Sequence, residues 1–293
     1  MSTPELRTVR THVLEIAYEE AGPPGGEPVL LLHGWPDSVR TWDAVVPALA
    51  GEGYRCLAPY LRGFGPTRFI ASSTPRSGQA TALAQDAKDF ADALGLDRFI
   101  LVGHDWGGFA AYLVAAIWPE RVKRLVVLSV GYGINNPEQT IALPQARAFW
   151  YQWFFHTRQG EQHLERDRRA FCRFIWQTWM APGRFREEEF EAAAPAWDNP
   201  DWVAVTVHYY RHRWGNVAGD PRYEALEVFR LEPPQIRVPT RVLHGADDAC
   251  ILPATTEGKE SYFTGGYTRQ ELPGVGHFPQ REQPEAVIAA IAQ

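Results

Sequence analysis

The sequence has few of the residues that would indicate disulfide bonds, nucleic-acid binding or a membrane span. Its three cysteines, Cys56, Cys172 and Cys250, are widely spaced and odd in number, so we expect free, buried thiols. The net charge of −6, without a cluster of Lys and Arg, excludes a basic surface for nucleic acid or anionic lipid. No apolar run approaches the length of a membrane span, and residues 1–10 lack the apolar core of a signal peptide. The sequence therefore predicts a cytoplasmic protein.

What the sequence does contain is an ordinary globular composition and an uneven distribution of tryptophan. Hydrophobic residues make up 45% and charged residues 22% of the 293 positions. Seven of the 11 tryptophans lie between residues 150 and 214. This local excess indicates a segment that differs from the rest of the chain.

Apolar runs and helical patterns alternate along most of the chain. Strands are predicted at residues 9–18, 28–32, 54–59, 98–102, 124–130, 239–244 and 267–272. Helices are predicted near 41–52 and at 81–95, 109–116 and 284–292. This alternation is typical of an α/β fold, a mostly parallel sheet with helices on both faces.

The alternation stops between residues 134 and 225, where the pattern is helical and aromatic without a buried strand. We therefore predict an α/β core of residues 1–133 and 226–293, with a helical cap of residues 134–225 inserted in it. In open α/β sheets, ligands bind beyond the carboxyl ends of the strands. The cap is expected to cover that end and to supply apolar walls for a small apolar or aromatic substrate.

The residues that carry the chemistry begin with Gly103-His-Asp-Trp-Gly-Gly108, between a predicted buried strand and a predicted helix. A short sequence of this kind, with glycines around a central nucleophile, is typical of the sharp strand-to-helix turn called a nucleophile elbow. Serine is the usual nucleophile, whereas this chain has Asp105. An aspartate in a turn also occurs as an ordinary helix cap. We predict a nucleophile because a histidine, His277, follows the last predicted strand.

Further groups are expected to gather around Asp105. His277 is a candidate general base, and either Asp247 or Asp248, at the end of the preceding strand, is placed to orient it. The backbone N–H groups of Trp35 and Trp106 are candidates for an oxyanion hole. His33 and His104 are interpreted as packing or hydrogen-bonding residues.

These pieces resemble, in their order along nearly the whole chain, the α/β-hydrolase fold family and, within it, the epoxide hydrolases. The resemblance is carried by His-Gly-Trp-Pro at 33–36, Arg-Gly-Phe-Gly at 62–65, Gly-His-Asp-Trp-Gly-Gly at 103–108, Trp-Tyr-Gln at 150–152, Tyr-Tyr-Arg at 209–211 and Gly-His-Phe at 276–278. It implies that Asp248, rather than Asp247, is the orienting acid. It also implies that Tyr151 and Tyr210 activate the epoxide oxygen, with Tyr209 as the competitor of Tyr210.

The implied reaction has two steps. The Asp105 carboxylate opens the epoxide to an alkyl ester, and a water activated by His277 hydrolyses that ester to a vicinal diol. The reaction requires neither a metal nor an organic cofactor. The side chains expected to contact the substrate are those of Trp35, Trp106, Trp150, Phe154 and Tyr209.

Three alternatives stay open. A haloalkane dehalogenase resembles this chain in its fold and its aspartate nucleophile, but it needs N–H donors for the halide, and Trp35 stands where that family often has asparagine. A fluoroacetate-type dehalogenase typically has arginine where this chain has Trp106. The third alternative is a non-catalytic binder of small ligands, for which an orienting acid would have no use. The protein itself is expected to be a monomer or a homodimer.

Overall fold

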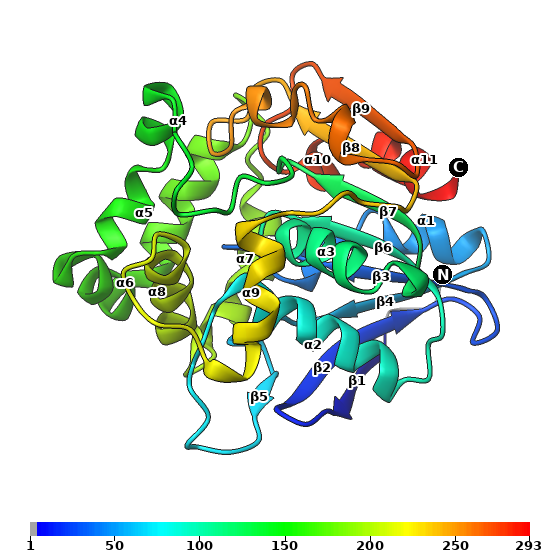
Figure 1. The fold of residues 1–293 in the computed structure, drawn as a ribbon, viewed down its shortest axis with the longest axis horizontal. Helices are drawn as coiled ribbons and strands as arrows, with labels where there is room; N and C mark the ends of the chain where they lie inside the picture. Colours follow the sequence, from blue (N-terminus) through cyan, green and yellow to red (C-terminus); the bar gives the residue numbers. More distant parts are fainter. Residues whose placement is uncertain (1–4) are drawn as a thin grey trace.

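In the computed structural model, which describes residues 5–293, nine strands form one mostly parallel sheet with helices on both faces (Figure 1). The strands are β1 (Glu5–Arg10), β2 (Leu14–Ala21), β3 (Glu27–Leu32), β4 (Tyr54–Pro59), β5 (Arg68–Phe69), β6 (Phe99–His104), β7 (Val122–Leu128), β8 (Thr240–Gly245) and β9 (Tyr267–Leu272). Their order in the sheet is β1-β2-β4-β3-β6-β7-β8-β9, and β5 pairs with β2. The strands from β4 to β9 along this order are parallel, whereas β2 runs antiparallel to β1, β4 and β5. The α/β prediction is confirmed. The first four residues of the segment expected to lack a signal peptide lie outside the described range.

The helices are α1 (Val46–Gly51), α2 (Ala80–Ala93), α3 (Trp106–Ile117), α4 (Leu143–Ala148), α5 (Trp150–Phe155), α6 (Arg158–Trp179), α7 (Glu187–Ala193), α8 (Trp202–Arg213), α9 (Glu224–Leu231), α10 (Pro279–Glu282) and α11 (Pro284–Ala292). Short 3₁₀ helices are η1 (Val39–Trp42), η2 (Pro119–Arg121), η3 (Ala194–Asp198), η4 (Pro221–Tyr223), η5 (Pro253–Thr256) and η6 (Glu260–Tyr262).

The continuous apolar strands divide their side chains between two hydrophobic cores. In β3, Leu30 and Leu32 pack into the core that includes α2 and α3, whereas Val29 and Leu31 pack into the core that includes α1 and α11. Successive side chains of a strand point to opposite faces, so a strand buried on both faces must be apolar throughout. This explains why the predicted strand at 28–32 is an unbroken apolar run.

The predicted strand at residues 9–18 is wrong in one respect, because it is two antiparallel strands. The chain turns between β1 and β2, where the Thr11 N–H donates to the Leu14 carbonyl at 2.8 Å. The Thr11 hydroxyl also accepts the N–H groups of Val13 and Leu14 at 3.4 and 3.1 Å. A threonine side chain that satisfies the backbone in this way favours a turn over a continuous strand.

The predicted helix near residues 41–52 is also divided, into η1 and α1. Pro47 lies in the first turn of α1, where its missing N–H costs no intrahelical hydrogen bond. The helix therefore begins at Val46, and the residues before it form a separate turn. Both helices lie close to β4, on the same face of the sheet as α11.

Helices α4 to α8 lie between β7 and β8 in the sequence and beyond the carboxyl ends of the central strands in space (Figure 1). They contain the tryptophan-rich segment, and Trp176, Trp179, Trp197 and Trp202 are almost fully buried. These side chains belong to the same hydrophobic core as Leu30 and Leu32 of β3, so their burial fastens the helical segment to the sheet. None of the helices within residues 5–293 is long and apolar enough to cross a membrane.

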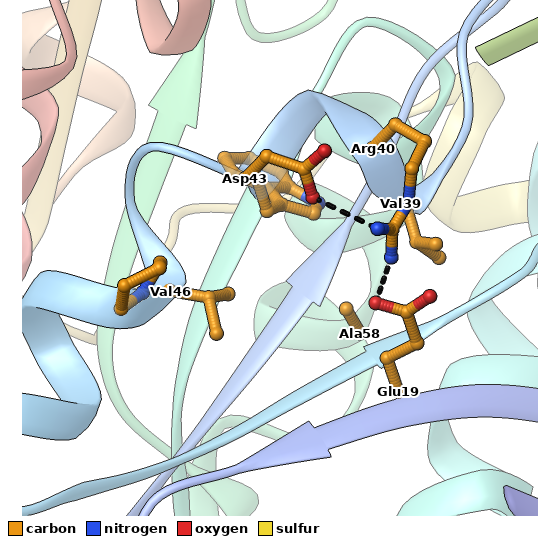
Figure 2. A pocket seen from close by; sticks show the side chains of 8 residues that line it. Glu19, Val39, Arg40, Asp43, Val46 and Ala58 are labelled. Atoms are coloured by element: carbon orange, nitrogen blue, oxygen red, sulfur yellow. Dashed lines mark ion pairs between the residues drawn. The ribbon is translucent and has the colours of Figure 1, made fainter. Parts of the chain in front are cut away.

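A hollow of about 210 Å³ lies beside η1, α1 and β4 (Figure 2). Across it Arg40 pairs with Glu19 and, at 3.2 Å, with Asp43. None of its lining residues is a predicted site residue, so this hollow is not the candidate site.

Candidate active site

Asp105 occupies a strained turn between β6 and α3. Its backbone has φ 49° and ψ −116°, a conformation that residues with a side chain rarely adopt. Two glycines permit this turn through close packing: a Cβ on Gly103 would lie 2.3 Å from the Gly107 carbonyl oxygen, and one on Gly107 would lie 2.3 Å from that of Leu32. The turn places the Asp105 carboxylate beside the Trp35 backbone and the His277 ring.

The two oxygens of the Asp105 carboxylate have different neighbours. Oδ1 accepts the Trp35 backbone N–H at 2.8 Å. Oδ2 lies 3.6 Å from Nε2 of His277. The Trp106 N–H, the other predicted oxyanion donor, lies at the first residue of α3, where the positive end of the helix dipole favours an anion.

The structure brings His277 and Asp248 together. Nδ1 of His277 lies 2.8 Å from Oδ2 of Asp248, so the His277 N–H donates to this carboxylate. Both side chains are buried, whereas Asp247 is exposed. The His277 backbone N–H donates to the Trp179 carbonyl at 2.8 Å, which ties the loop to the end of α6.

The two carboxylates control the charge of His277. Burial alone would lower the pKa of His277, but the charges of Asp248 and Asp105 outweigh it and raise this pKa to about 10. Burial opposes ionisation of Asp105, yet its contact with His277 and the Trp35 N–H hold its pKa below the usual value. The free site is therefore an imidazolium between two carboxylates, and an ester on Asp105 would remove one of the charges that keep His277 protonated.

Tyr151 of α5 and Tyr210 of α8 meet edge to face, with ring centroids 5.2 Å apart. The Tyr210 hydroxyl oxygen accepts the Trp106 indole N–H at 3.2 Å, and that of Tyr151 accepts the Gln152 amide N–H at 2.8 Å. Burial is the largest of the effects that raise the pKa of both hydroxyls. Both are therefore protonated at neutral pH, and each oxygen already accepts an N–H. The Tyr151 hydroxyl also lies 3.6 Å from Sγ of Cys250, a weak hydrogen-bond partner.

Tyr209 lies differently from its neighbour. Its ring stacks on Trp106 with centroids 3.9 Å apart and an angle of 13°. Its hydroxyl has no hydrogen-bond partner within the described part of the chain. Of the two adjacent tyrosines, Tyr210 is the one in contact with Tyr151.

Trp35 is the centre of the aromatic cluster that closes the site. Its ring stacks on Tyr151 with centroids 5.5 Å apart, and Tyr210 meets its edge at 5.4 Å. Sequence reasoning missed other members of this cluster, although two of them, Phe155 and Trp202, share a helix with predicted residues at a spacing that was a usable signal. The missed members are Phe155, Phe171, Trp179 and Trp202.

Two predicted substrate contacts, Trp150 and Phe154, lie farther from the centre. Trp150 is 38% exposed and packs against Phe171 and Phe174. Phe154 is half-buried and stacks on Phe171 at 6.4 Å. Both therefore lie outside the cluster of side chains that contact Trp35, and their contact with a substrate stays a prediction.

His33 and His104 have the hydrogen-bonding roles expected of them. Nε2 of His33 accepts the Leu61 N–H at 3.1 Å, and its Nδ1 donates to the Gly34 carbonyl at 3.0 Å. Nε2 of His104 donates to the His277 carbonyl at 2.7 Å. Burial lowers the pKa of each to about 4, so both are neutral supports of the site.

The three cysteines are free and buried, as predicted. Within residues 5–293, no three or more His, Cys, Asp or Glu side chains are arranged to hold a metal ion. The donors that the structure places at Asp105 are the Trp35 backbone N–H and the His277 imidazole.

Comparison with known proteins agrees with this architecture. Residues 27–284 match the family model of the alpha/beta hydrolase fold. Epoxide hydrolase 3 of Siraitia grosvenorii is 28% identical over 309 residues, covering 97% of this chain and 96% of the relative. Epoxide hydrolase A of Mycobacterium tuberculosis is 27% identical over 320 residues, covering 100% and 98%.

A solved structure is more similar still. The crystal structure of a candidate epoxide hydrolase from Klebsiella pneumoniae is 40% identical, with a TM-score of 0.92 over 98% of this chain and 96% of the other. The fold, the order of the motifs and these similarities together lead to one assignment. The chain belongs to the alpha/beta hydrolase fold family and, within it, to the epoxide hydrolase-like proteins.

Proposed function

We propose that this protein hydrolyses epoxides to vicinal diols through an ester on Asp105, with residues 134–225 as its cap. The observation that carries the proposal is the pair of protonated hydroxyls, Tyr151 and Tyr210, packed on Trp35, whose backbone N–H holds Asp105. Relatives named epoxide hydrolases support the same activity.

In the first step, a carboxylate oxygen of Asp105 attacks a ring carbon and the C–O bond of the epoxide breaks. The leaving oxygen becomes an alkoxide that stays attached to the substrate and needs a proton or strong hydrogen bonds. Tyr151 and Tyr210 supply them, since each hydroxyl oxygen already accepts an N–H. One of them gives its proton to the alkoxide and is left as a tyrosinate. The product is a hydroxyalkyl ester of Asp105.

In the second step, the ester is neutral, so His277 loses one of its two carboxylate partners. It releases its proton, which reaches the tyrosinate through solvent, and becomes a base at neutral pH. It removes a proton from a water molecule, which attacks the Asp105 carboxyl carbon. The Trp35 N–H, at 2.8 Å from Oδ1, is already placed for the developing oxyanion. Collapse of this intermediate expels the diol oxygen, which takes the proton from His277. The carboxylic acid formed on Asp105 then gives its proton to His277, which restores the carboxylate and the imidazolium.

The hydrogen bonds of the two indoles argue against a dehalogenase. A halide ion needs N–H donors, and Trp106 donates its indole N–H to Tyr210 while Trp35 donates its own to Thr206 at 3.1 Å. The contact between His277 and Asp248 argues against a pure binder, because a binding site has no need of an oriented base.

The function is tested by incubating the protein with styrene oxide and, separately, with 1-bromobutane. We expect phenylethanediol from the first and no bromide from the second. Bromide without diol would support the dehalogenase, and neither product would support the binder.

The ester is tested with His277→Gln and styrene oxide. Because this variant lacks the base, the ester should form and persist, and peptide mass spectrometry should find the adduct on Asp105. The matched variant Asp105→Asn should carry no adduct. An adduct on another residue would contradict the proposed nucleophile.

A further inference from the structure

A second histidine, which the proposed mechanism does not use, contacts the Asp248 carboxylate. His244 lies in β8 and is fully buried. Its Nε2 is 3.1 Å from Oδ2 of Asp248 and 2.7 Å from the Ile251 carbonyl oxygen. Both neighbours are acceptors at neutral pH, so Nε2 must carry the proton and donate.

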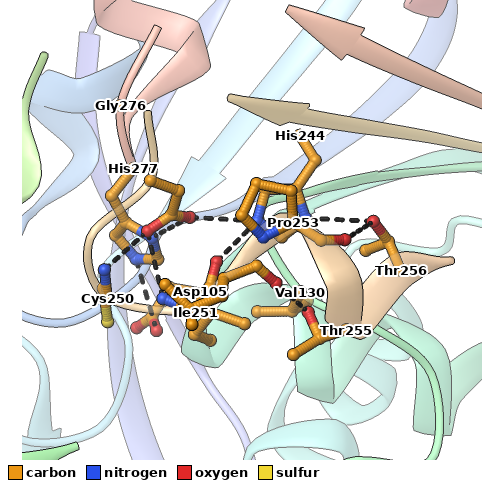
Figure 3. Close-up of polar contacts among 12 residues, drawn as sticks. Asp105, Val130, His244, Cys250, Ile251, Pro253, Thr255, Thr256, Gly276 and His277 are labelled. Atoms are coloured by element: carbon orange, nitrogen blue, oxygen red, sulfur yellow. Dashed lines mark hydrogen bonds and ion pairs between the residues drawn. The ribbon is translucent and has the colours of Figure 1, made fainter. Parts of the chain in front are cut away.

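Asp248 is consequently surrounded by donors. Its Oδ2 is shared between Nδ1 of His277 at 2.8 Å and Nε2 of His244 at 3.1 Å. Its Oδ1 accepts the N–H groups of Cys250 and Ile251 at 2.8 and 3.0 Å. Figure 3 shows His277 and His244 on the two sides of this cluster, with Thr256 beyond His244. A carboxylate oxygen that accepts from two imidazoles interacts less strongly with each of them.

We propose that His244 is a positioning residue that sets the basicity of His277 by sharing the Asp248 oxygen with it. The inference rests on the proposed function, in which His277 must give up its proton before the ester can be hydrolysed. The His244 N–H draws part of the negative charge of Asp248 to itself. It thereby weakens the hold of Asp248 on the His277 imidazolium and makes His277 a usable base at lower pH.

Contacts on the other side of the ring keep His244 in place. The Thr256 hydroxyl lies 3.2 Å from Nδ1 of His244. The same hydroxyl accepts the Nε–H of Arg269 at 2.9 Å, and its one proton has two possible acceptors, Nδ1 of His244 and the Pro253 carbonyl at 2.8 Å. The ring is also held at its other edge, because Nε2 lies 2.7 Å from the Ile251 carbonyl oxygen as well as 3.1 Å from Asp248.

Other titratable groups face this cluster and are the same in all the proteins compared in the titration below, where Asp105 is replaced by Asn throughout, so a shift can be attributed to His244. They are His104 in β6, Asp105 at the elbow, Tyr151 in α5, Cys250 beyond β8, Arg269 in β9 and Glu282 in α10.

The test measures the titration of His277 in the full-length chain. Asp105→Asn imitates the neutral ester and should lower the pKa of His277. The other substitutions are made in this Asp105→Asn protein, which serves as the common background. The ring signal of ¹³C-labelled His277 is assigned by its loss in His277→Gln. Against this background we expect His244→Phe, which lacks the N–H, to raise the pKa of His277 by about one unit.

His244→Gln is the conservative rescue, because its amide nitrogen can donate from nearly the same place as Nε2. It should keep the His277 titration near that of the background protein. Thr256→Val, which disturbs the loop without removing the donor, should lower thermal stability and leave the titration in place. If His244→Phe does not fold, His244→Leu is the second donor-free variant.

With Asp105 intact, the rate of ester hydrolysis should follow the titration. The rate of ester hydrolysis should rise with pH as His277 loses its proton. In His244→Phe, the midpoint of this rise should move to higher pH by the same amount as the pKa, and at pH values below the midpoint hydrolysis should be about tenfold slower. Ester formation should be unchanged. The inference would be overturned if the pKa of His277 stayed the same or fell in the donor-free variants. It would also be overturned if His244→Gln raised this pKa as much as His244→Phe does. Because the titration needs no turnover, a failure of the proposed function would be seen separately, as absence of diol.

Discussion

At the scale of single residues, the site depends on pairs of neighbours that differ in what they contact. Tyr209 and Tyr210 are adjacent in α8, yet one stacks on Trp106 and the other meets Tyr151. Successive residues of a helix point about 100° apart, so two neighbours cannot share one role. The proposal therefore gives the proton-donating role to Tyr210 and leaves Tyr209 a packing role.

This difference is tested by removing one hydroxyl at a time. Tyr151→Phe and Tyr210→Phe should each slow ester formation by about 10²-fold, because each removes one donor to the leaving oxygen. Single-turnover kinetics with styrene oxide would measure this step apart from ester hydrolysis, which should change little.

Tyr209→Phe is the matched control, since it removes a hydroxyl from the adjacent, equally buried position. Its rate of ester formation should remain close to that of the unmodified protein. If Tyr209→Phe slowed ester formation as much as Tyr210→Phe does, Tyr209 rather than Tyr210 would be the proton donor.

The sequence predicted the residue types of the site better than their partners. Asp105 and His277 were identified because a strand-to-helix turn and a loop after the last strand are local patterns. The second histidine on Asp248 was missed, because a histidine in a buried strand has no pattern that distinguishes it. Only the approach of β8 to the loops that carry Asp248 and His277 makes His244 a partner of the site.

At the scale of elements, Glu282 in α10 joins the His277 loop to the end of α6. Its Oε2 accepts the N–H groups of Gly276 and Ala181 at 2.8 and 3.0 Å, and its Oε1 accepts that of Phe278 at 3.2 Å. One buried carboxylate thus satisfies three backbone donors from two segments. Both residues that flank His277 are held in this way.

Glu282→Ala should lower the free energy of unfolding by at least about 2 kcal/mol, because it leaves buried N–H groups without acceptors. It should also slow ester hydrolysis, since the His277 loop is no longer fixed. Urea denaturation and single-turnover kinetics measure the two effects. Glu285→Ala, on the exposed side of α11, is the control and should change neither. Unchanged stability in Glu282→Ala would contradict the role of this carboxylate.

Element boundaries were predicted less well than element types. The buried strands were identified because both faces of the sheet require apolar side chains, which leaves an unbroken run. The turn inside residues 9–18 was missed because it depends on one threonine hydroxyl that caps the backbone, and the β-like pattern continues across it.

At the scale of the whole molecule, buried neutral histidines make the stability of the fold depend on pH. The pKa of His33 and of His104 is lowered by burial from an ordinary value of about 6.5 to about 4. Between these values the unfolded chain binds protons that the folded protein does not. Stability must therefore fall as the pH decreases from about 6.5 to 4. Over the same range His277, whose pKa is raised, stays protonated in the folded protein and contributes its full stabilisation.

Urea denaturation at a series of pH values would measure this slope. His104→Gln keeps an N–H donor for the His277 carbonyl but cannot titrate, so its stability should depend less steeply on pH, with up to about 3 kcal/mol less loss at pH 4. His12→Gln, at an exposed position, is the control. An unchanged slope in His104→Gln would mean that this ring titrates normally in the folded protein.

The sequence by itself determined the fold class, the position of the strained turn at Asp105 and the set of chemical groups available to the site. Apolar periodicity and glycine spacing are local consequences of a two-sided sheet and a strained turn, so they are visible in a single chain. The resemblance favoured Asp248 over Asp247 and Tyr210 over Tyr209, but only the tertiary structure shows which carboxylate meets His277, which tyrosine meets Tyr151, and that His244 shares the Asp248 carboxylate. These contacts join residues from the sheet, from α5 and α8 and from the last loops, and their geometry exists only after the chain has packed around Asp105.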